Sequence, residues 1–127
     1  MNFFEQELRR FTGKETAFKS SKPVYVGRAC FIPLSGNRRA RLEFVTRGVA
    51  DHYDALNVTI LSTTDGRIDI LQLRFDEYFA RRKGGCSGTV TPHIWVYRDE
   101  TEWYVAPTSL EIKAIAQAAY DYIMLFA

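Results

Sequence analysis

Alternation of apolar and polar residues in the middle of the chain is the feature that most constrains its fold. Apolar side chains recur at every second position along residues 40–44 and again along residues 56–60. A period of two places successive side chains on opposite faces of a β-strand, so both runs predict half-buried strands. Arg39, Arg41 and Glu43 fill the alternate positions of the first run, which indicates a charged outer face.

Two more runs extend this sheet. Residues 24–34 are apolar at both parities, which predicts one long strand that is either central in the sheet or carries a bulge near Gly27. Residues 63–66 end in Asp-Gly, which supplies the positive φ of a tight hairpin turn. On the returning strand the apolar positions change parity between Ile70 and Leu71, and we expect a bulge there.

The segments around these strands are less regular. Residues 48–54 are expected to form a loop, and residues 76–83 either one helical turn or an irregular connection. A last hairpin pairs residues 93–97 with residues 102–105. Because the connections are short, neighbouring strands are predicted to be antiparallel and not joined by crossovers.

Helical spacing marks both ends of the chain. Residues 2–12 place Phe and Leu side chains on one face, and residues 108–126 carry an apolar stripe at the spacing of an amphipathic helix. Each helix opens with a predicted capping pair, Asn2 with Glu5 and Thr108 with Glu111. The first helix is short and therefore has to pack against the sheet to be stable.

These elements predict a single α+β domain over residues 1–127. We expect a five- or six-stranded, mainly antiparallel sheet with the N-terminal and C-terminal helices packed on one face. A chain of 127 residues buries enough surface to fold without metal or disulfide staples. No apolar run is long enough to span a bilayer, so we expect a soluble protein without a membrane partner.

Charge and cysteine content narrow the functional class only slightly. With 17 basic and 15 acidic residues the formal net charge is +2, unlike a dedicated nucleic-acid binder or an acidic DNA mimic. The two cysteines show no metal-ligand spacing and are expected to be reduced thiols of a cytoplasmic protein. Cys30 lies in a strand-like run and is expected in the core, whereas Cys86 lies in a glycine-rich loop.

No catalytic motif is recognisable in the sequence. The glycine spacing of nucleotide-binding loops is absent, and His52 and His93 lack the spacing of a metal site. We therefore expect a chain that is not an enzyme and that uses no cofactor and no metal ion. A role for Asp51 and His52 in acid–base chemistry, or for Cys86 as a nucleophile, stays open.

Basic residues gather along residues 38–47 and in a run just before the glycine-rich loop. If the uncovered face of the sheet also presents the rings of the last hairpin, guanidinium groups and aromatic rings interleave on one surface. The candidate partner- or nucleic-acid-binding residues are Arg38, Arg39, Arg41, Arg47, Arg81, Arg82, Lys83, Trp95, Tyr97 and Tyr104.

Three interpretations of these residues stay open. Arginines contact phosphates and rings stack on bases in single-stranded nucleic-acid sites. Arg, Trp and Tyr are also enriched at hot spots of protein interfaces, where exposed strand edges pair with a partner or a second copy. Alternatively, the outward arginines solubilise the face and pair across strands with Glu43, Asp69 and Glu102. The oligomeric state is not predicted.

Four segments carry a family resemblance: residues 1–9, residues 26–30, residues 50–56 and the hairpin of residues 94–105. They resemble small uncharacterised accessory proteins encoded on conjugative and other mobile elements of Gram-positive gut bacteria. The resemblance covers nearly the whole chain but includes no catalytic motif, so it transfers no functional residues. It implies a role in countering host defences, as anti-CRISPR and anti-restriction inhibitors do, or in the transfer of single-stranded DNA.

Together these features predict a non-enzymatic binding module of a mobile genetic element that inhibits a host defence nuclease. Its protein partner would be the nuclease, for example a CRISPR effector, or the complex of that nuclease with nucleic acid. The alternative is an accessory protein that binds single-stranded DNA or RNA directly through the two basic groups.

Overall fold

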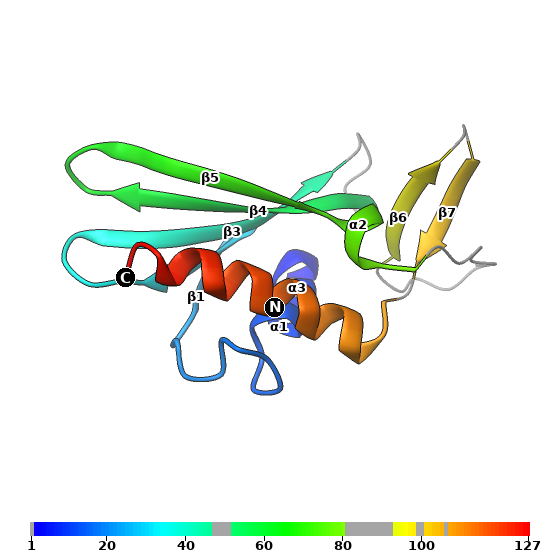
Figure 1. The fold of residues 1–127 in the computed structure, drawn as a ribbon, viewed down its shortest axis with the longest axis horizontal. Helices are drawn as coiled ribbons and strands as arrows, with labels where there is room; N and C mark the ends of the chain where they lie inside the picture. The colour runs from blue at the N-terminus through cyan, green and yellow to red at the C-terminus, as the bar shows by residue number, and fades with distance from the viewer. Residues whose placement is uncertain (1, 47–51, 81–92, 99–100, 106) are drawn as a thin grey trace.

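The computed structural model of the chain describes residues 2–46, 52–80, 93–98, 101–105 and 107–127. Within residues 93–98 and 101–105 it describes the backbone alone. This part of the chain forms one sheet with the two long helices on the same face (Figure 1). In chain order the elements are α1 Phe3–Thr12, β1 Val24–Val26, β2 Ala29–Pro33, β3 Arg38–Thr46, β4 His52–Ser62, β5 Gly66–Arg74, α2 Phe75–Tyr78, β6 His93–Arg98, β7 Thr101–Val105 and α3 Ser109–Met124.

The predicted α+β architecture is confirmed. Strands β1 to β5 form a five-stranded antiparallel sheet in chain order, because each strand pairs with the next one. The antiparallel hairpin β6–β7 joins this sheet at β4. Helices α1 and α3 cover one face, as expected from their apolar stripes (Figure 1). The single turn of α2 is one of the two structures predicted for that segment.

The run at residues 24–34 forms two strands, so the prediction of a single long strand, central or with a bulge, is wrong. Strands β1 and β2 are joined by a two-residue turn, and Val26 pairs with Ala29 across it. Gly27 adopts φ 59°, the left-handed conformation that glycine supplies at the first position of such hairpin turns. Both strands are apolar, and apolarity alone does not distinguish one long strand from a tight hairpin.

Strand β4 begins earlier than the sequence indicates. It starts at His52, so the loop expected at residues 48–54 is wrong for its last three residues. The first two residues of β4 pair in parallel with His93 and Ile94 of β6. The connection between the two strands includes β5 and α2, so this crossover contradicts the expectation that neighbouring strands are not joined by crossovers, whereas the sheet is mainly antiparallel as predicted.

Strand β5 contains a bulge, but not at the predicted residues. Its register against β4 shifts once and leaves Ile68 as the extra residue. The expected position was between Ile70 and Leu71, where the apolar positions change parity. The turn that precedes β5 is as predicted, with Gly66 at φ 70°.

The core lies between the sheet and the helices. Both predicted helix caps are present: Asn2 accepts a hydrogen bond from the Glu5 amide, and Thr108 and Glu111 form a reciprocal capping box. Phe44 stacks on Tyr53 at a ring-centroid distance of 4.4 Å. The largest fully buried side chains are Leu8, Phe11, Phe18, Ile32, Leu42, Tyr53, Leu56, Ile60, Phe75, Ile115 and Ile123.

Candidate functional site

The face of the sheet turned away from α1 and α3, which we call the open face, carries a row of residues that is apolar at both ends. Strand register sets five side chains beside one another across β1–β5, namely Val24, Phe31, Arg41, Thr59 and Ile70. Val24 is 56% exposed and Ile70 is 44% exposed. Val26, next to Val24 on the same face of β1, is 58% exposed. These side chains leave aliphatic surface in water that a partner can cover.

Arginines surround this row, and few carboxylates accompany them. The guanidinium carbon of Arg39 lies 4.4 Å from the ring centroid of Phe31, a cation–π contact. Arg41 Nε lies 3.2 Å from Glu43 Oε1, an ion pair along one strand. Arg67 is in the same cross-strand row as Arg39. Three neighbouring rows make up this part of the open face: the row of Arg39 and Arg67, the apolar-ended row, and the row of Glu43. Among their described residues, Glu43 is the only one with a carboxylate side chain. This part of the open face is therefore basic.

A groove of about 640 Å³ opens beside the first residue of β1, where β2 extends beyond β1. Val24, the first residue of β1, pairs with Phe31, so within the described residues Pro33 has a strand partner on the β3 side only. The lining combines arginines with apolar side chains and includes no carboxylate. Its main members are Val24, Val26, Phe31, Pro33, Leu34, Arg38 and Arg39.

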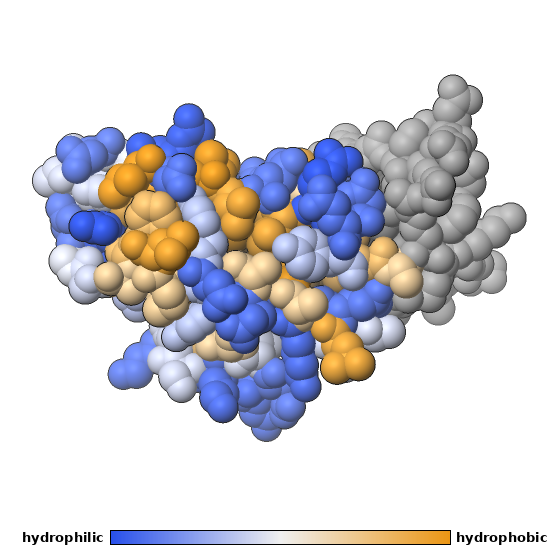
Figure 2. Space-filling model, in the orientation of Figure 1, coloured by the Kyte–Doolittle hydropathy of each residue, from blue (hydrophilic) through white to orange (hydrophobic). Residues whose placement is uncertain are grey.

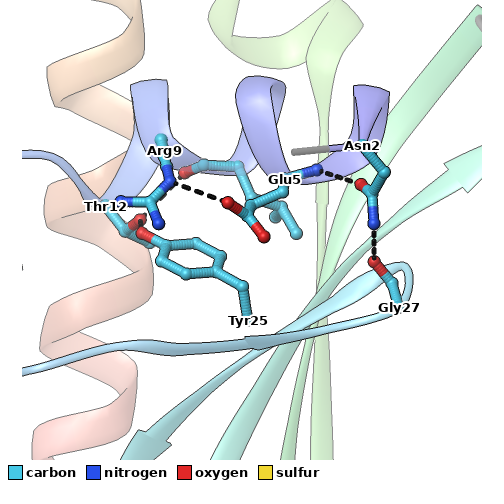
Figure 3. A network of polar contacts seen from close by, with 7 residues as sticks. Asn2, Glu5, Arg9, Thr12, Tyr25 and Gly27 are labelled. Carbon is cyan, nitrogen blue, oxygen red and sulfur yellow. Dashed lines mark hydrogen bonds and ion pairs between the residues drawn. The ribbon is translucent and has the colours of Figure 1, made fainter.

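Helix α1 holds the β1–β2 hairpin beside this groove (Figure 3). The Asn2 side-chain amide donates a 3.0 Å hydrogen bond to the carbonyl oxygen of Gly27 in the hairpin turn. The hydroxyls of Thr12 and Tyr25 lie 2.6 Å apart, and the Arg9 guanidinium stacks on the Tyr25 ring at 4.3 Å. Contacts at both ends of α1 therefore fix the short edge strand in place, although β1 has few residues of its own.

The structure describes only part of the predicted binding set. Arg38, Arg39 and Arg41 lie together on β3, and Arg38 donates a 3.1 Å hydrogen bond to the carbonyl oxygen of Phe126. Four further members lie outside the described residues, namely Arg47, Arg81, Arg82 and Lys83. The three predicted rings are described by their backbone positions alone, Trp95 and Tyr97 on β6 and Tyr104 on β7.

The backbone does not bring β6 next to the described arginines. β6 joins the sheet at Tyr53, near the start of β4, whereas Arg41 pairs with Thr59 six positions further along that strand. At about 3.3 Å per residue, the two places on β4 are about 20 Å apart. The hairpin β6–β7 accordingly lies at the end of β4 remote from the turn between β2 and β3 (Figure 1).

Of the three carboxylates predicted to pair with arginines across strands, one forms an ion pair with an arginine, within its own strand. Glu43 pairs with Arg41, but along β3 and not across strands. Asp69 instead accepts a 2.6 Å hydrogen bond from the hydroxyl of Tyr122 on α3. Asp69 therefore belongs to the contact between β5 and the helix layer and leaves the charge of the open face unchanged. Glu102 lies on β7, where only the backbone is described.

The candidate catalytic groups are only partly described. Asp51 and Cys86 lie outside the described residues, and of His52 only the backbone is described. Cys30 is fully buried, as predicted, and burial raises the pKa of its thiol to about 12. Its thiol is thus protonated at neutral pH. Within the described ranges no group of three or more His, Cys, Asp or Glu side chains is placed to hold a metal ion. None of the described helices combines the length and apolarity needed to cross a membrane.

Sequence reasoning missed the exposed aliphatic residues of the open face. The apolar pattern places Val24, Val26 and Ile70 in strands but does not predict their exposure, since apolar residues are normally taken as buried. A signal was present at Gly27, because a glycine at that position permits a two-residue turn and makes Val24–Val26 an edge strand. Asp69 is a second signal of exposure near Ile70, because a carboxylate interrupts the apolar spacing of the returning strand.

Other exposed apolar residues lie on the helix layer. Figure 2 shows apolar side chains over the β4–β5 hairpin and the C-terminal end of α3, among hydrophilic neighbours. On α3 and just after it, Leu110 is 77%, Met124 39% and Leu125 78% exposed. These residues sit on a different layer from the open face and lack its arginines. They provide matched control positions for substitutions on that face.

Comparisons with known proteins identify no relative. No protein-family model, no curated protein and no solved structure matches the chain. The nature of a partner therefore has to follow from the chemistry of the open face.

Proposed function

We propose that this chain is a non-enzymatic binding domain that attaches to a protein partner through the open face. The observation that carries the proposal is the juxtaposition of exposed aliphatic side chains with arginines on one sheet face. Val24, Val26 and Ile70 offer apolar area, and Arg39 and Arg67 add positive charge in the neighbouring row. An interface built this way combines burial of apolar area with charge complementarity.

The chemistry of the described face favours protein over nucleic acid. Single-stranded nucleic acid binds to rings that are free to stack on bases. Phe31, the aromatic residue of the apolar-ended row, is half-buried, and one side of its ring faces the Arg39 guanidinium. Arg41 forms an ion pair with Glu43, which partly neutralises its charge. Aliphatic side chains such as Val24 and Ile70 contribute little to base stacking but much to protein contacts.

The biological role we propose is inhibition of a host defence nuclease by a cytoplasmic protein of a mobile genetic element. The support is the resemblance to accessory proteins of such elements together with the binding face. An inhibitor of this kind acts by occupying a surface that the nuclease needs, so it requires no catalytic residues of its own. The basic open face would cover an acidic region of the nuclease.

The test is a protection assay in bacteria that carry an active CRISPR or restriction system. Expression of the chain should raise the survival of a targeted plasmid, and the tagged chain should capture the nuclease. The double variant Val24→Glu with Ile70→Glu should lose both effects, whereas Leu110→Glu, on α3, should keep them. No protection and no captured nuclease with the wild-type chain would contradict the proposed role.

Direct binding of single-stranded DNA or RNA is the second candidate, and the arginines of β3 and β5 are the observation that favours it. Its measurement is the fluorescence anisotropy of labelled oligonucleotides at several salt concentrations. Phosphate contacts predict an affinity that falls steeply with salt and is strongest near about 50 mM. Absence of binding at low salt would exclude this candidate.

A further inference from the structure

The outer edge of β1 presents a peptide group for pairing. In antiparallel hairpins with a two-residue turn, the pair next to the turn exchanges both backbone hydrogen bonds, and the next pair points its groups outward. Val26 and Ala29 are the pair next to the turn, so the N–H and C=O of Tyr25 point away from β2. Within the described residues no other strand pairs with β1. An extended segment can therefore add to the sheet at Tyr25.

The surroundings of this edge select the kind of segment. Val24 and Val26 flank Tyr25 and are more than half exposed on the open face, so they offer apolar contacts to alternate residues of an added strand. The groove that begins at Val24 contains Arg38 and Arg39 and no carboxylate in its lining. A segment with acidic side chains complements this charge, and its remaining residues fit the apolar walls.

We infer that the partner contributes an extended segment that adds to β1 as an antiparallel strand, with two aliphatic residues beside Val26 and Val24 and an acidic residue two positions further on, whose carboxylate lies on the same face at Arg39. This inference rests on the proposed function and specifies the element of the partner that is recognised. Backbone hydrogen bonds to Tyr25 supply the register, and the arginine selects for acidic sequence. Because α1 already fixes the hairpin, binding requires little further ordering of this chain.

A second copy of the chain is a poorer occupant of the same edge. Symmetric pairing of two β1 strands brings two copies of this basic groove close together, and like charges in contact weaken association. Single-stranded nucleic acid satisfies Arg39 but forms no backbone pairing with Tyr25 and leaves Val24 and Val26 without apolar contacts. The acidic peptide segment is the occupant that uses the edge, the apolar side chains and the arginines together.

The test uses defined peptides and the whole chain labelled with ¹⁵N. The probe is acetyl-Val-Thr-Val-Thr-Glu-amide, in which the two Val residues and the Glu share one face, compared with its Lys-for-Glu counterpart and with a version whose central backbone nitrogens are methylated. The acidic peptide should shift the Tyr25 amide resonance most strongly. The basic and the methylated peptides should bind at least about tenfold more weakly, because each removes one class of contact.

A charge exchange makes the test specific for the groove. Arg39→Glu should lose the acidic peptide and gain the basic one, Arg39→Gln should weaken the first without gaining the second, and Lys19→Glu, at an exposed position away from the groove, should change neither. Each of four results would overturn the inference. The acidic and basic peptides could bind equally well, or methylation could have no effect on binding. The largest resonance shifts could lie away from β1, or an oligothymidine could displace the peptide. If the nuclease is captured in cells while the acidic peptide fails, the inference falls and the proposed function stands. If the acidic peptide binds but no nuclease is captured in cells, the proposed function falls and the recognition of an acidic segment stands.

Discussion

Thr59 lies between Arg41 and Ile70 in the apolar-ended row and is 1% exposed. Its hydroxyl has no hydrogen-bond partner among the described residues. A buried hydroxyl without a partner loses its hydration and gains nothing in return. Such a residue in the middle of the open face lowers the stability of the isolated chain.

Replacing Thr59 with valine should therefore stabilise the protein by about 1 kcal/mol, because valine has a similar shape and no group to desolvate. The matched control is Thr12→Val, since the Thr12 hydroxyl lies 2.9 Å from the Leu8 carbonyl and 2.6 Å from the Tyr25 hydroxyl. That variant should lose about 1–2 kcal/mol. Urea unfolding followed by circular dichroism measures both. Equal destabilisation by the two substitutions would show that the Thr59 hydroxyl is in fact paired.

Cys30 makes stability depend on pH in the alkaline range. Burial raises the pKa of its thiol from 9.0 to about 12, so above pH 9 the unfolded chain releases a proton that the folded chain keeps. Its contribution is complete below pH 9 and falls by about 1.4 kcal/mol per pH unit as the pH rises toward 12. Between pH 8 and pH 10 the wild-type chain should lose about 1.4 kcal/mol more stability than Cys30→Ala. Urea unfolding of both proteins under reducing conditions measures the difference, and parallel pH profiles would contradict it.

The link between α1 and the β1–β2 hairpin is the element-scale feature on which the site depends. Asn2 uses both ends of its side-chain amide: the oxygen accepts from the Glu5 amide at 2.7 Å, and the nitrogen donates to the Gly27 carbonyl. One side chain thus caps the helix and fixes the hairpin turn. β1 alone, with three residues, is too short to keep its register unaided.

Two substitutions separate the functions of Asn2. Asn2→Asp keeps the capping oxygen and removes the donor to Gly27, so it should cost about 1 kcal/mol; Asn2→Ala removes both and should cost about 2 kcal/mol. Thermal and urea unfolding give the stabilities, and hydrogen exchange of the β1 amides reports the hairpin. Asn2→Asp should speed exchange in β1 while leaving α1 protected. Unchanged exchange in β1 would mean that the contact with Gly27 does not hold the hairpin.

Local signals in the sequence predict the helices well and the strand pairings less well. The caps at Asn2 and Thr108 and the apolar stripe of α3 are contained within a few residues, and all are found in the structure. The division of β1 from β2 at Gly27 depends on one backbone conformation, which an apolar run does not reveal. The parallel pairing of β4 with β6 depends on packing between distant segments, and short connections alone do not predict it.

The candidate site, like the fold, was predictable only where its signals lie within one strand. Alternation correctly places Arg39 and Arg41 on the outer face of β3, because that signal lies within one strand. The exposure of Val24 and Ile70 was not predictable from their residue type. The distance between β3 and Trp95 follows from the order of strands in the sheet, which only the fold supplies.

At the scale of the whole molecule, charge and apolar area are distributed unevenly. Although the formal charge of the whole chain is only +2, the open face around Arg39, Arg41 and Arg67 carries more arginines than carboxylates. The helix layer covers the other face and buries the core, so the open face is the broad sheet surface that no described helix covers (Figure 1). Under the proposed function, this division places binding on the open face and leaves stability to the face that the helices cover.

Hydrogen–deuterium exchange of the chain, free and in complex with the nuclease captured in the protection assay, tests this division most directly. The amides of β1, including Tyr25, and those of the groove around residues 33–39 should become protected on binding, while α3 exchanges at an unchanged rate. Protection that appears on α3, with β1 and the groove unchanged, would contradict the assignment of the open face as the binding surface.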